Sequence, residues 1–392
     1  MRRINALFSL FMRRIMCIFA VLSRNRMAKY IYQYKSWPNF TWNEMEIQIL
    51  LGKLRHLQGK LFGQISTLGF SIKEETKLSN LTLDVVKSSE IEGEILNYEQ
   101  VRSSIARKLG IEYAGMVFPN RNVDGVVEML LDATQQYEKP LDEERLFDWH
   151  AALFPMGRSG LYKINVACYR KDEMQIVSGA MGKERVHYQA PVGQVKLEMD
   201  KFLDWLNNKS DIDMVIKSAI AHFWFIIIHP FDDGNGRIAR AISDLLLARS
   251  EASSLRFYSL SNQMLLERKV YYATLQNVQH HDGDITEWIV WFLNCLYRAL
   301  KKSEKTIEKV LDKADFWDKH KNTALNSRQR LMINKLFDGF VGKLKTSKWA
   351  KIAKCSQDTA LRDIKDLIEK NILRQEKSGG RSTNYELNDL SD

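Results

Sequence analysis

Apolar residues recur at intervals of three and four along most of the chain, and this spacing predicts amphipathic helices. Only 6 prolines and 20 glycines occur among the 392 residues, which argues against a loop-rich or all-β protein. The fold class expected from the pattern is therefore mainly α. The expected helices span residues 43–64, 76–93, 120–137, 142–153, 194–207, 211–228, 236–250, 263–280 and 286–300.

The pattern changes between residues 157 and 192, where glycines gather and apolar positions alternate with polar ones. Residues 174–177 and 185–188 have the alternation of two short strands, and the turn between them contains glycine. This segment predicts a β-hairpin, or flap, within an otherwise helical protein.

The composition is that of a globular protein, with 45% hydrophobic and 27% charged residues. A chain of 392 residues has room for two or three domains. The four cysteines lie far apart without paired spacing, which disfavours a disulfide framework or a zinc site and fits the reducing cytoplasm.

The first 26 residues differ from the rest. They contain six arginines and no acidic residue, so they carry more than half of the net charge of +10. Arg13 and Arg14 split their apolar runs, which are shorter than the ~20 residues of a membrane span, so no membrane partner is expected. A basic helix on a membrane surface remains an alternative. We favour a non-domain extension before a translation start at Met27.

The sequence HPFDDGNGRIAR, residues 229–240, directly follows an apolar run and combines the groups that a phosphate site needs. Gly234 and Gly236 allow successive backbone N–H groups to surround an anion, and the helix expected after them points its N-terminus at the same place. Arg237 and Arg240 are three residues apart and share one helix face, so their guanidiniums suit a di- or triphosphate.

Two further residues of this stretch add chemistry. Asp233 lies beside the phosphate site, where a carboxylate can hold Mg²⁺. His229 ends the apolar run, and its imidazole can accept a proton near neutral pH. Each residue taken singly has a structural alternative, such as a core histidine or a common glycine turn. Together, at this spacing, they form a much more specific signal.

The stretch resembles the Fic family signature, HPF-x-[D/E]-GNGR-x-x-R, at every defined position. Residues 271–293 and the hairpin at 174–191 are also similar to Fic proteins, and the stretch WPNFTW resembles a bacterial subgroup that carries a C-terminal winged helix. The resemblance covers residues 27–392. It implies protein AMPylation, in which a Ser, Thr or Tyr hydroxyl of a target protein, or of the enzyme itself, attacks the α-phosphorus of ATP in the presence of Mg²⁺.

The resemblance also assigns roles. His229 would deprotonate the attacking hydroxyl, Asp233 would hold Mg²⁺, and Phe231 would anchor the loop. The residues implied to bind the nucleotide are Gly234, Asn235, Gly236, Arg237, Arg240, Tyr271, Tyr272, Val177 and Gly179. For the two tyrosines, core packing is an equal alternative. Some Fic relatives transfer UMP, phosphocholine or phosphate, but the glycine at position 236 favours nucleotidyl transfer.

A second stretch, KSSEIEGE at residues 87–94, bears on the first. Glu92 falls in the last turn of a helix, where the helix dipole disfavours negative charge, so it needs a cationic partner or solvent. Ser88, Glu92 and Gly93 match the inhibitory motif of the Fic family, [S/T]-x-x-x-E-[G/N]. The match implies an intramolecular Glu92–Arg240 salt bridge that occupies the arginine needed by the γ-phosphate.

Residues 345–373 resemble a helix-turn-helix, in which Ser356 caps a second helix that carries Thr359, Arg362 and Lys365. The following stretch resembles a β-wing that turns at Gly379 and Gly380. The net charge of this region is modest for a DNA-binding module, so protein interaction or dimerisation is an equal alternative to DNA binding.

The expected organisation has five parts: an extension (1–26), an N-terminal helical domain with the inhibitory motif (27–110), a Fic catalytic domain (111–300), a linking helix (301–324) and a winged helix (325–392). The main hypothesis is an autoinhibited cytoplasmic protein adenylyltransferase, for which a homodimer is an open expectation. The alternatives are a DNA-binding regulator whose Fic core senses nucleotide, and a de-AMPylase.

Overall fold

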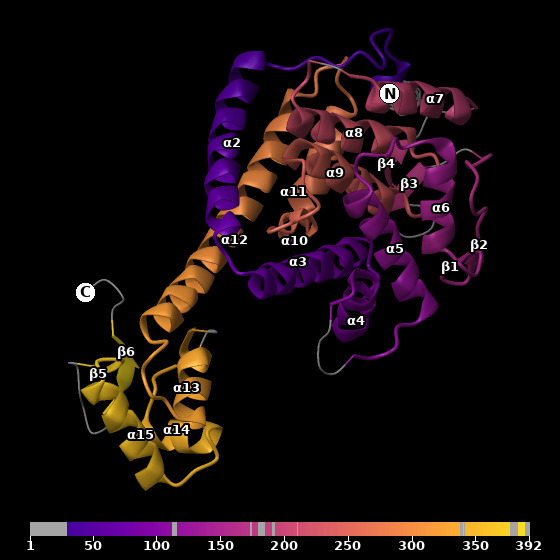
Figure 1. The fold of residues 1–392 in the computed structure, drawn as a ribbon. Coiled ribbons are helices and arrows are strands. Elements are labelled where there is room, and N and C mark those ends of the chain that lie inside the picture. Colours follow the sequence, from indigo (N-terminus) through magenta and orange to yellow (C-terminus); the bar gives the residue numbers. More distant parts are fainter. Residues whose placement is uncertain are drawn as a thin grey trace, which may run out of the picture. The chain divides into compact units, whose positions relative to one another are not determined.

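The computed structural model describes residues 30–111, 116–172, 175–178, 185–189, 193–209, 211–337, 340, 342–376 and 383–388. The expected mainly α fold is confirmed (Figure 1). The chain divides into two compact units, one formed by Met1–Gly59 and Phe70–Leu300, the other by Lys60–Gly69 and Lys301–Asp392. Among the described residues, no helix combines the length and the hydropathy that a membrane span needs.

The first unit is built from helices and two short hairpins. Its elements are η1 (Ile31–Gln33), the first part of α2 (Glu44–Ser66), α3 (Phe70–Ile91), α4 (Tyr98–Leu109), α5 (Arg121–Gln135), α6 (Glu143–Leu153), β1 (Arg158–Ser159), β2 (Tyr162–Lys163), β3 (Gln175–Ser178), β4 (Arg185–Gln189), α7 (Val195–Asn207), α8 (Met214–Ile228), α9 (Asn235–Glu251), α10 (Leu260–Leu266), α11 (Arg268–Val278) and the first part of α12 (Thr286–Lys319).

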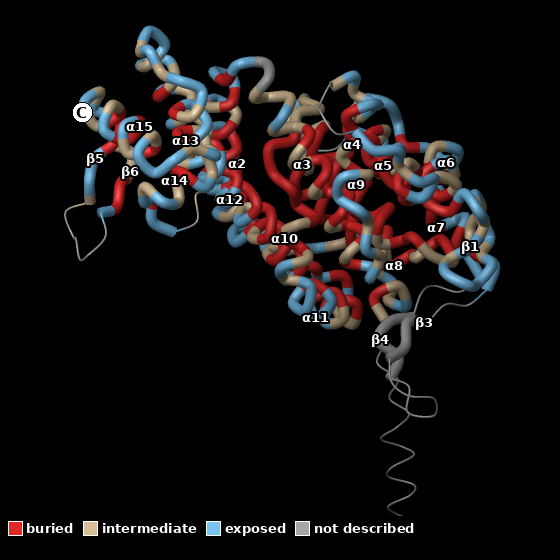
Figure 2. Tube along the Cα trace, turned by 90° about the horizontal axis from the view of Figure 1, so that it is seen from below, coloured by how far each residue is buried: buried red, intermediate tan, exposed pale blue. Residues whose placement is uncertain are grey.

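The helical hairpin of α8 and α9 lies at the centre of this unit and is almost entirely buried (Figure 2). Asp213 caps α8 by accepting a hydrogen bond from the Val215 backbone N–H at 2.8 Å. Apolar residues cover α8 all round, which is typical of a helix in the core rather than on a surface. This pair fixes the position of the loop between its helices, residues 229–234.

The helix α3 packs against α10, α4 and α9 (Figure 1). It ends in a Schellman motif, because Gly93 adopts φ +87° and its N–H bonds the Glu90 carbonyl while the Glu94 N–H bonds the Ser89 carbonyl. Glycine takes this left-handed conformation without a steric penalty. The motif reverses the chain and turns Glu94 back toward α9.

Several elements differ from the sequence expectation, among them α3, which starts at Phe70 instead of residue 76. The helix expected over 263–280 is broken at Glu267 into α10 and α11, and the helix α4 was not expected. The helix α12 runs without a break from Thr286 to Lys319, so the helix expected over 286–300 and most of the linking helix expected over 301–324 form one continuous helix. The predicted hairpin is present, since β3 pairs antiparallel with β4 and Gln175 lies opposite Gln189.

The aromatic stretch after residue 30 does not form a subdomain of its own. Trp37 and Phe40 pack edge-on against Trp224 of α8. The Trp37 indole N–H also donates to Glu198 of α7 at 2.7 Å. These residues therefore extend the core around α8.

The second unit contains a small helical core of its own. Besides the last parts of α2 and α12, its elements in chain order are α13 (Ser327–Phe337), α14 (Thr346–Ile352), α15 (Gln357–Glu369), β5 (Leu373–Gln375) and β6 (Tyr385–Leu387). Ser356 caps α15 as predicted, because its hydroxyl accepts from the Thr359 N–H at 3.2 Å. β5 and β6 pair antiparallel, and the expected wing turn at Gly379 and Gly380 lies outside the described residues.

The contact of α5 with α6 leaves no space for a side chain at Gly125, where a Cβ would lie 1.8 Å from the Ala152 carbonyl oxygen. We predict that Gly125→Ala separates these helices and lowers the free energy of unfolding by about 1–3 kcal/mol. Gly52→Ala is the matched control, because that glycine lies in α2 with no atom near its Cβ position. The control should raise stability by roughly 0.5–1 kcal/mol, since alanine favours a helix. Urea titrations of both variants measure the two effects, and equal midpoints would contradict the prediction.

Candidate functional site

The loop between α8 and α9 starts at His229, which ends α8 in the left-handed conformation with φ +51°. Its backbone N–H still bonds the Phe225 carbonyl at 2.9 Å, and its carbonyl accepts from Arg170 Nε at 2.7 Å. A left-handed backbone is uncommon for a residue with a β-carbon and needs support from its surroundings. Arg170, which is 5% exposed, supplies that support and was missed by the sequence analysis.

The His229 ring is arranged to act as a base. Its Nδ1 lies 3.2 Å from the Ile226 carbonyl oxygen, which can only accept, so Nδ1 carries the proton and Nε2 carries the lone pair. Burial lowers the pKa of His229 to about 4, and the nearby Arg170 contributes to the lowering. The imidazole is therefore neutral, and able to accept a proton, throughout the physiological pH range.

The rest of the loop is held by hydrogen bonds to its own backbone. The Asn235 side chain accepts from the Phe231 N–H at 3.0 Å and donates to the Phe231 carbonyl at 2.7 Å. Phe231 itself is fully buried, as predicted for an anchor. Asn235 therefore shapes the loop with its side chain, while its backbone N–H lies in the first turn of α9.

His150 on α6 supports the same loop and was also missed by the sequence analysis. Its Nδ1 accepts from the Ala167 N–H at 3.2 Å, so Nε2 is the protonated nitrogen and donates to the Asp233 carbonyl at 3.2 Å. Its ring stacks on Phe231 with centroids 4.2 Å apart. Burial lowers the pKa of His150 to about 4, which keeps the ring neutral in this role. No periodicity could have identified it, because His150 lies 79 residues before His229, the first residue of the loop.

The Asp233 carboxylate is the candidate metal ligand. Its Oδ1 accepts from the Gly234 N–H at 2.5 Å, its Oδ2 accepts from the Ser159 hydroxyl, and its side chain is 42% exposed. Among the described residues there is no cluster of three or more metal-binding side chains. Mg²⁺ at a nucleotide site commonly uses one or two carboxylates together with phosphate and water oxygens, so a single accessible carboxylate fits that ion.

The predicted contact between Glu92 and Arg240 is present. Arg240 Nη2 lies 2.7 Å from Glu92 Oε1 and 2.9 Å from the Ser88 carbonyl oxygen, and Arg240 Nε donates to the Ser88 hydroxyl at 2.8 Å. The guanidinium side chain is only 2% exposed. Removing one partner of a buried ion pair is costly, roughly 3–5 kcal/mol, since the other charge is left uncompensated. Arg240 therefore fixes the end of α3 against α9.

Arg237 has an equivalent partner that the sequence analysis did not find. Its Nη1 lies 2.7 Å from Glu94 Oε2, and its guanidinium lies over the Phe154 ring at 5.1 Å. Glu94 reaches Arg237 because the left-handed Gly93 reverses the chain after α3. The signal was the second acid in the sequence EGE, immediately after the glycine. Each arginine of the stretch 229–240 thus has one carboxylate from the segment 92–94.

Gly236 is required by close packing. A Cβ at this position would lie 2.0 Å from Glu92 Oε1, so a residue larger than glycine requires the end of the Glu92 side chain to move from its present place beside Arg240. Gly234 is N-terminal to α9 with φ +83°, a conformation that favours glycine. The geometry around the N-terminus of α9 therefore accounts for glycine at both positions, 234 and 236, that were predicted to surround phosphate.

A cavity of about 630 Å³ opens beside these groups, and its lining includes Glu92, His229, Gly236, Tyr271 and Tyr272. This volume is within the usual range for a small-molecule site. The Tyr271 hydroxyl also bonds His222 Nε2 at 3.0 Å in the core, so this tyrosine packs in the core as well as lining the cavity, and its contact with a nucleotide stays a prediction. Val177 lies in β3, where only the backbone is described, and Gly179 lies outside the described residues.

Comparison with known proteins identifies related sequences. Residues 140–247 match the Fic/DOC family, and residues 30–111 match a domain of unknown function (DUF4172). The protein adenylyltransferase Fic of Culex quinquefasciatus is 27% identical over 218 residues, which are 54% of this chain and 39% of the relative. The protein adenylyltransferase fic-1 of Caenorhabditis elegans is 44% identical over 55 residues, 14% of this chain and 11% of the relative.

The fold has a counterpart among solved structures. A Fic family protein from Desulfovibrio desulfuricans G20 superimposes with a TM-score of 0.52 at 21% identity, over 91% of this chain and 99% of that one. The chain thus spans about two fifths of the length of the Culex relative, and the solved structure supports the fold alone.

Glu92 and Glu94 neutralise Arg240 and Arg237, which lie in the first turns of α9. Removing either negative charge should therefore strengthen anion binding at the N-terminus of this helix. We predict that Glu92→Gln and Glu94→Gln each tighten pyrophosphate binding about tenfold, or ~1.4 kcal/mol, in isothermal titration calorimetry. Glu90→Gln is the matched control, because Glu90 lies on the same helix and pairs with Lys87 instead. The assignment fails if all three variants bind pyrophosphate with the affinity of the unmodified protein.

Proposed function

The chain carries a Fic/DOC-family domain over residues 140–247, and from this premise we propose that it is a protein adenylyltransferase. The observation that supports the proposal is the shared cavity, whose lining includes both His229, the proposed base, and Gly236 of the proposed phosphate-binding turn. Its substrates are ATP and a protein hydroxyl, and this protein is itself an expected target.

In the proposed reaction, the hydroxyl oxygen of the target forms a bond to the α-phosphorus of ATP. The bond from that phosphorus to the bridging oxygen of the β-phosphate breaks, and pyrophosphate leaves. The proton of the hydroxyl passes to Nε2 of His229, which is the lone-pair nitrogen in the tautomer fixed by Ile226. Pyrophosphate leaves as an anion next to the N-terminus of α9, where backbone N–H groups stabilise negative charge.

The remaining predicted residues divide the binding of ATP between them. The backbone of Gly234, Asn235 and Gly236 would hold the α- and β-phosphates, and Arg237 would add positive charge. Arg240 would bind the γ-phosphate. Asp233 would hold Mg²⁺, which neutralises phosphate charge when bound, and Ser159 orients that carboxylate by a hydrogen bond. Tyr271 and Tyr272 would form the wall next to the nucleoside.

We further propose that the protein is autoinhibited. Glu92 and the γ-phosphate compete for one guanidinium, since Arg240 cannot satisfy both from a site that is 2% exposed. The 2.7 Å contact of Arg237 with Glu94 supports the same account, because it neutralises the second cation. Release requires the end of α3 to leave α9. A homodimer that controls this release remains an expectation, and the free thiols of Cys168, Cys295 and Cys355 suit the proposed cytoplasmic location.

The transfer reaction predicts a clear order of activities with ATP labelled by ³²P at the α-phosphate. Glu92→Gly should raise AMP incorporation at least about tenfold, because ~1.4 kcal/mol of competition at Arg240 is removed. His229→Ala in the Glu92→Gly background should lower it about 10²–10⁴-fold through loss of the base. His56→Ala, an exposed histidine on α2, is the matched control and should have no effect.

Other outcomes of the labelling experiment separate the alternatives. No incorporation by Glu92→Gly would sink the transferase assignment and favour a nucleotide-sensing core. Release of AMP from a previously labelled protein by the unmodified enzyme would favour a de-AMPylase. Competition by unlabelled UTP or GTP would show that the base is not selected.

We propose duplex DNA as a second partner, through the second compact unit. The acids Asp363, Asp366, Glu376 and Glu386 are engaged in ion pairs with Arg328, Lys370, Lys343 and Arg374. Residues 345–369 present five exposed basic residues, Lys345, Lys351, Lys354, Arg362 and Lys365, against two exposed acids, Asp358 and Glu369. Positive charge on such a helix favours contacts with phosphates.

The DNA proposal predicts binding in a gel-shift assay with the full chain at low salt. Replacing Arg362 and Lys365 by Glu should abolish the shift, because it removes two phosphate contacts and adds repulsion. Replacing Arg328 and Arg374 by Glu is the charge-matched control on the paired side of the unit and should weaken the shift less. Equal loss in both double variants, or no shift at any salt concentration, would contradict it.

A further inference from the structure

The helices α3 and α9 meet in a matched antiparallel register. Asp84 and Ser88 of α3 are four residues apart and share one face, and Glu92 follows four residues later, directly after the end of that helix. On α9, Gly236, Arg240 and Asp244 have the same spacing. Glu92 lies against Gly236 and Ser88 bonds Arg240 at 2.8 Å, so the register places Asp84 opposite Asp244. Arg240 bonds both Ser88 and Glu92, whereas the third level brings two carboxyl groups together.

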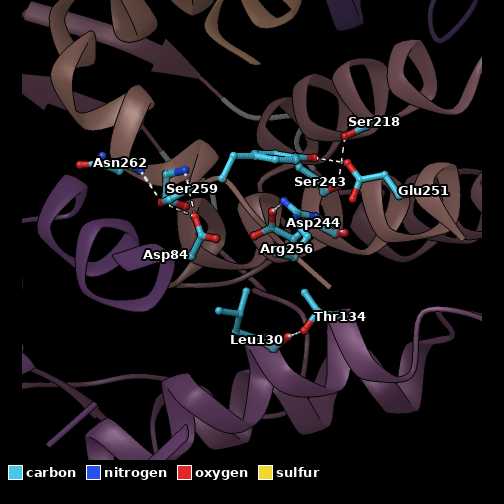
Figure 3. A network of polar contacts seen from close by, with 12 residues as sticks. Asp84, Leu130, Thr134, Ser218, Ser243, Asp244, Glu251, Arg256, Ser259 and Asn262 are labelled. Carbon is cyan, nitrogen blue, oxygen red and sulfur yellow. Dashed lines mark hydrogen bonds and ion pairs between the residues drawn. The ribbon is translucent and has the colours of Figure 1, made fainter. Parts of the chain in front are cut away.

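Both carboxyl groups of the third level are buried, and each residue is 2% exposed. Together with Ser88 and Arg240 they line a cavity of about 10 Å³, which is just large enough for one water molecule. Figure 3 shows how their side chains lie among their polar neighbours. Two ionised carboxylates in such a place repel each other and lose their hydration, so one of them needs a cation or a proton.

Arg256, a cation beside this pair, already bonds Asp244. Arg256, which is fully buried, pairs with Asp244 through Nη2 and donates from Nη1 to the Asp244 carbonyl at 3.0 Å (Figure 3). A third acid, Glu251, lies in the same network and accepts from the Tyr258 hydroxyl at 2.5 Å. Asp84, Asp244 and Glu251 therefore share Arg256, while Arg240, which lines the same cavity, is paired with Glu92.

Asp84 receives hydrogen bonds but no ion pair in this network. Its Oδ1 accepts from the Ser259 hydroxyl at 2.6 Å and from the Ser261 N–H at 3.3 Å. Ser259 in turn caps α10 by accepting from the Asn262 N–H at 3.1 Å, so Asp84 ties α3 to the start of α10 (Figure 3). These neutral donors favour the ionised carboxylate, but they do not replace a counter-ion in a buried place.

The charged groups around Asp84 come from each element packed on it. From α9 these are Arg237, Arg240 and Asp244, with Glu251 at the end of that helix. From the loop before α10 they are Arg256 and Tyr258. The helix α5 contributes only apolar groups, Val126, Met129 and Leu130. Arg237 and Arg240 are in turn paired with Glu94 and Glu92.

We propose that a proton on the Asp84 carboxyl holds α3 against α9 and α10, so that loss of this proton loosens the helix that carries Glu92. The proposal rests on the autoinhibition described above and adds the signal that releases it, namely a rise in pH. The Asp84–Asp244 pair lies outside the nucleotide site. Under the proposal, its protonation controls the stability of the Glu92–Arg240 contact.

The direction of the effect follows from linkage. Burial raises the pKa of Asp84 to about 8 when α3 is docked, and the charge of Asp244 adds to the rise. When α3 leaves, solvated Asp84 returns toward an ordinary pKa of about 4. The docked state is therefore fully favoured at low pH, weakens up to tenfold per pH unit as pH rises toward 8, and changes no further above it.

The test compares the unmodified protein with Glu92→Gly at pH 6.5, 7.5 and 8.5, as a ratio of initial AMP-incorporation rates. The ratio cancels the pH dependence of the chemistry itself, since both proteins use the same base. We expect the ratio to rise about tenfold or more over this range. Asp84→Asn should hold the ratio at its low-pH value, because asparagine stays neutral and its Oδ1 accepts the same two hydrogen bonds. Glu90→Gln is the control and should rise like the unmodified protein.

A second measurement needs neither catalysis nor a variant. Hydrogen exchange of the α3 amides, corrected for the intrinsic pH dependence, should show protection that falls between pH 6.5 and 8.5, while α8 stays protected. A flat ratio together with flat α3 protection, or a ratio that rises equally in Asp84→Asn, overturns the proposal. If Glu92→Gly transfers no AMP, the proposed function fails. The hydrogen-exchange experiment still tests whether the proton on Asp84 holds α3 in place.

Discussion

The buried charge of Arg240 is the constraint on which the rest of the site depends. A guanidinium that is 2% exposed must have an anionic partner, because its desolvation is otherwise uncompensated. In the present conformation the partner is Glu92, at 2.7 Å, and in the proposed complex it is the γ-phosphate. Under the proposed autoinhibition, activation does not create a new site. It exchanges one anion for another at a cation that is already in place.

This exchange has consequences for neighbouring elements. The anion that leaves is attached to α3, so the position of a whole helix becomes linked to the occupancy of one phosphate site. The Schellman motif at Gly93 adds Glu94 to the same linkage, since it directs that carboxylate to Arg237. The loop 229–234 does not need to move, because Asn235, His150 and Arg170 hold it from the core side. In this proposal, regulation depends on the segment at the end of α3, whereas the chemistry depends on the fixed loop 229–234.

Much of this could be predicted from the sequence, because local patterns determine it. The mainly α fold, the β3–β4 hairpin, the cap at Ser356 and the Glu92–Arg240 contact follow from periodicity, turn residues or a short motif. The family resemblance supplied the partner of Glu92, which spacing alone could not. The break at Glu267 and the continuous helix to Lys319 were not predicted, since the propensities on both sides of each point are equally helical.

The supporting residues of the site could not be predicted for a different reason. His150 and Arg170 reach the loop only through tertiary packing of α6 and of the segment after β2, and neither stands in a recognisable pattern. Asp84 looked like an ordinary polar residue on a helix. Its burial against Asp244 results from the register of two helices that are 143 residues or more apart in the sequence.

The central claim is that one guanidinium, that of Arg240, serves either Glu92 or the γ-phosphate. Crystal structures of the unmodified protein and of Glu92→Gly, each with Mg²⁺ and a non-hydrolysable ATP analogue, test it most directly. The account predicts Arg240 bonded to Glu92 in the first structure and to γ-phosphate oxygens in the second. A γ-phosphate bound to Arg240 while Glu92 stays within 3 Å of the same guanidinium, or one that never contacts Arg240, would contradict it.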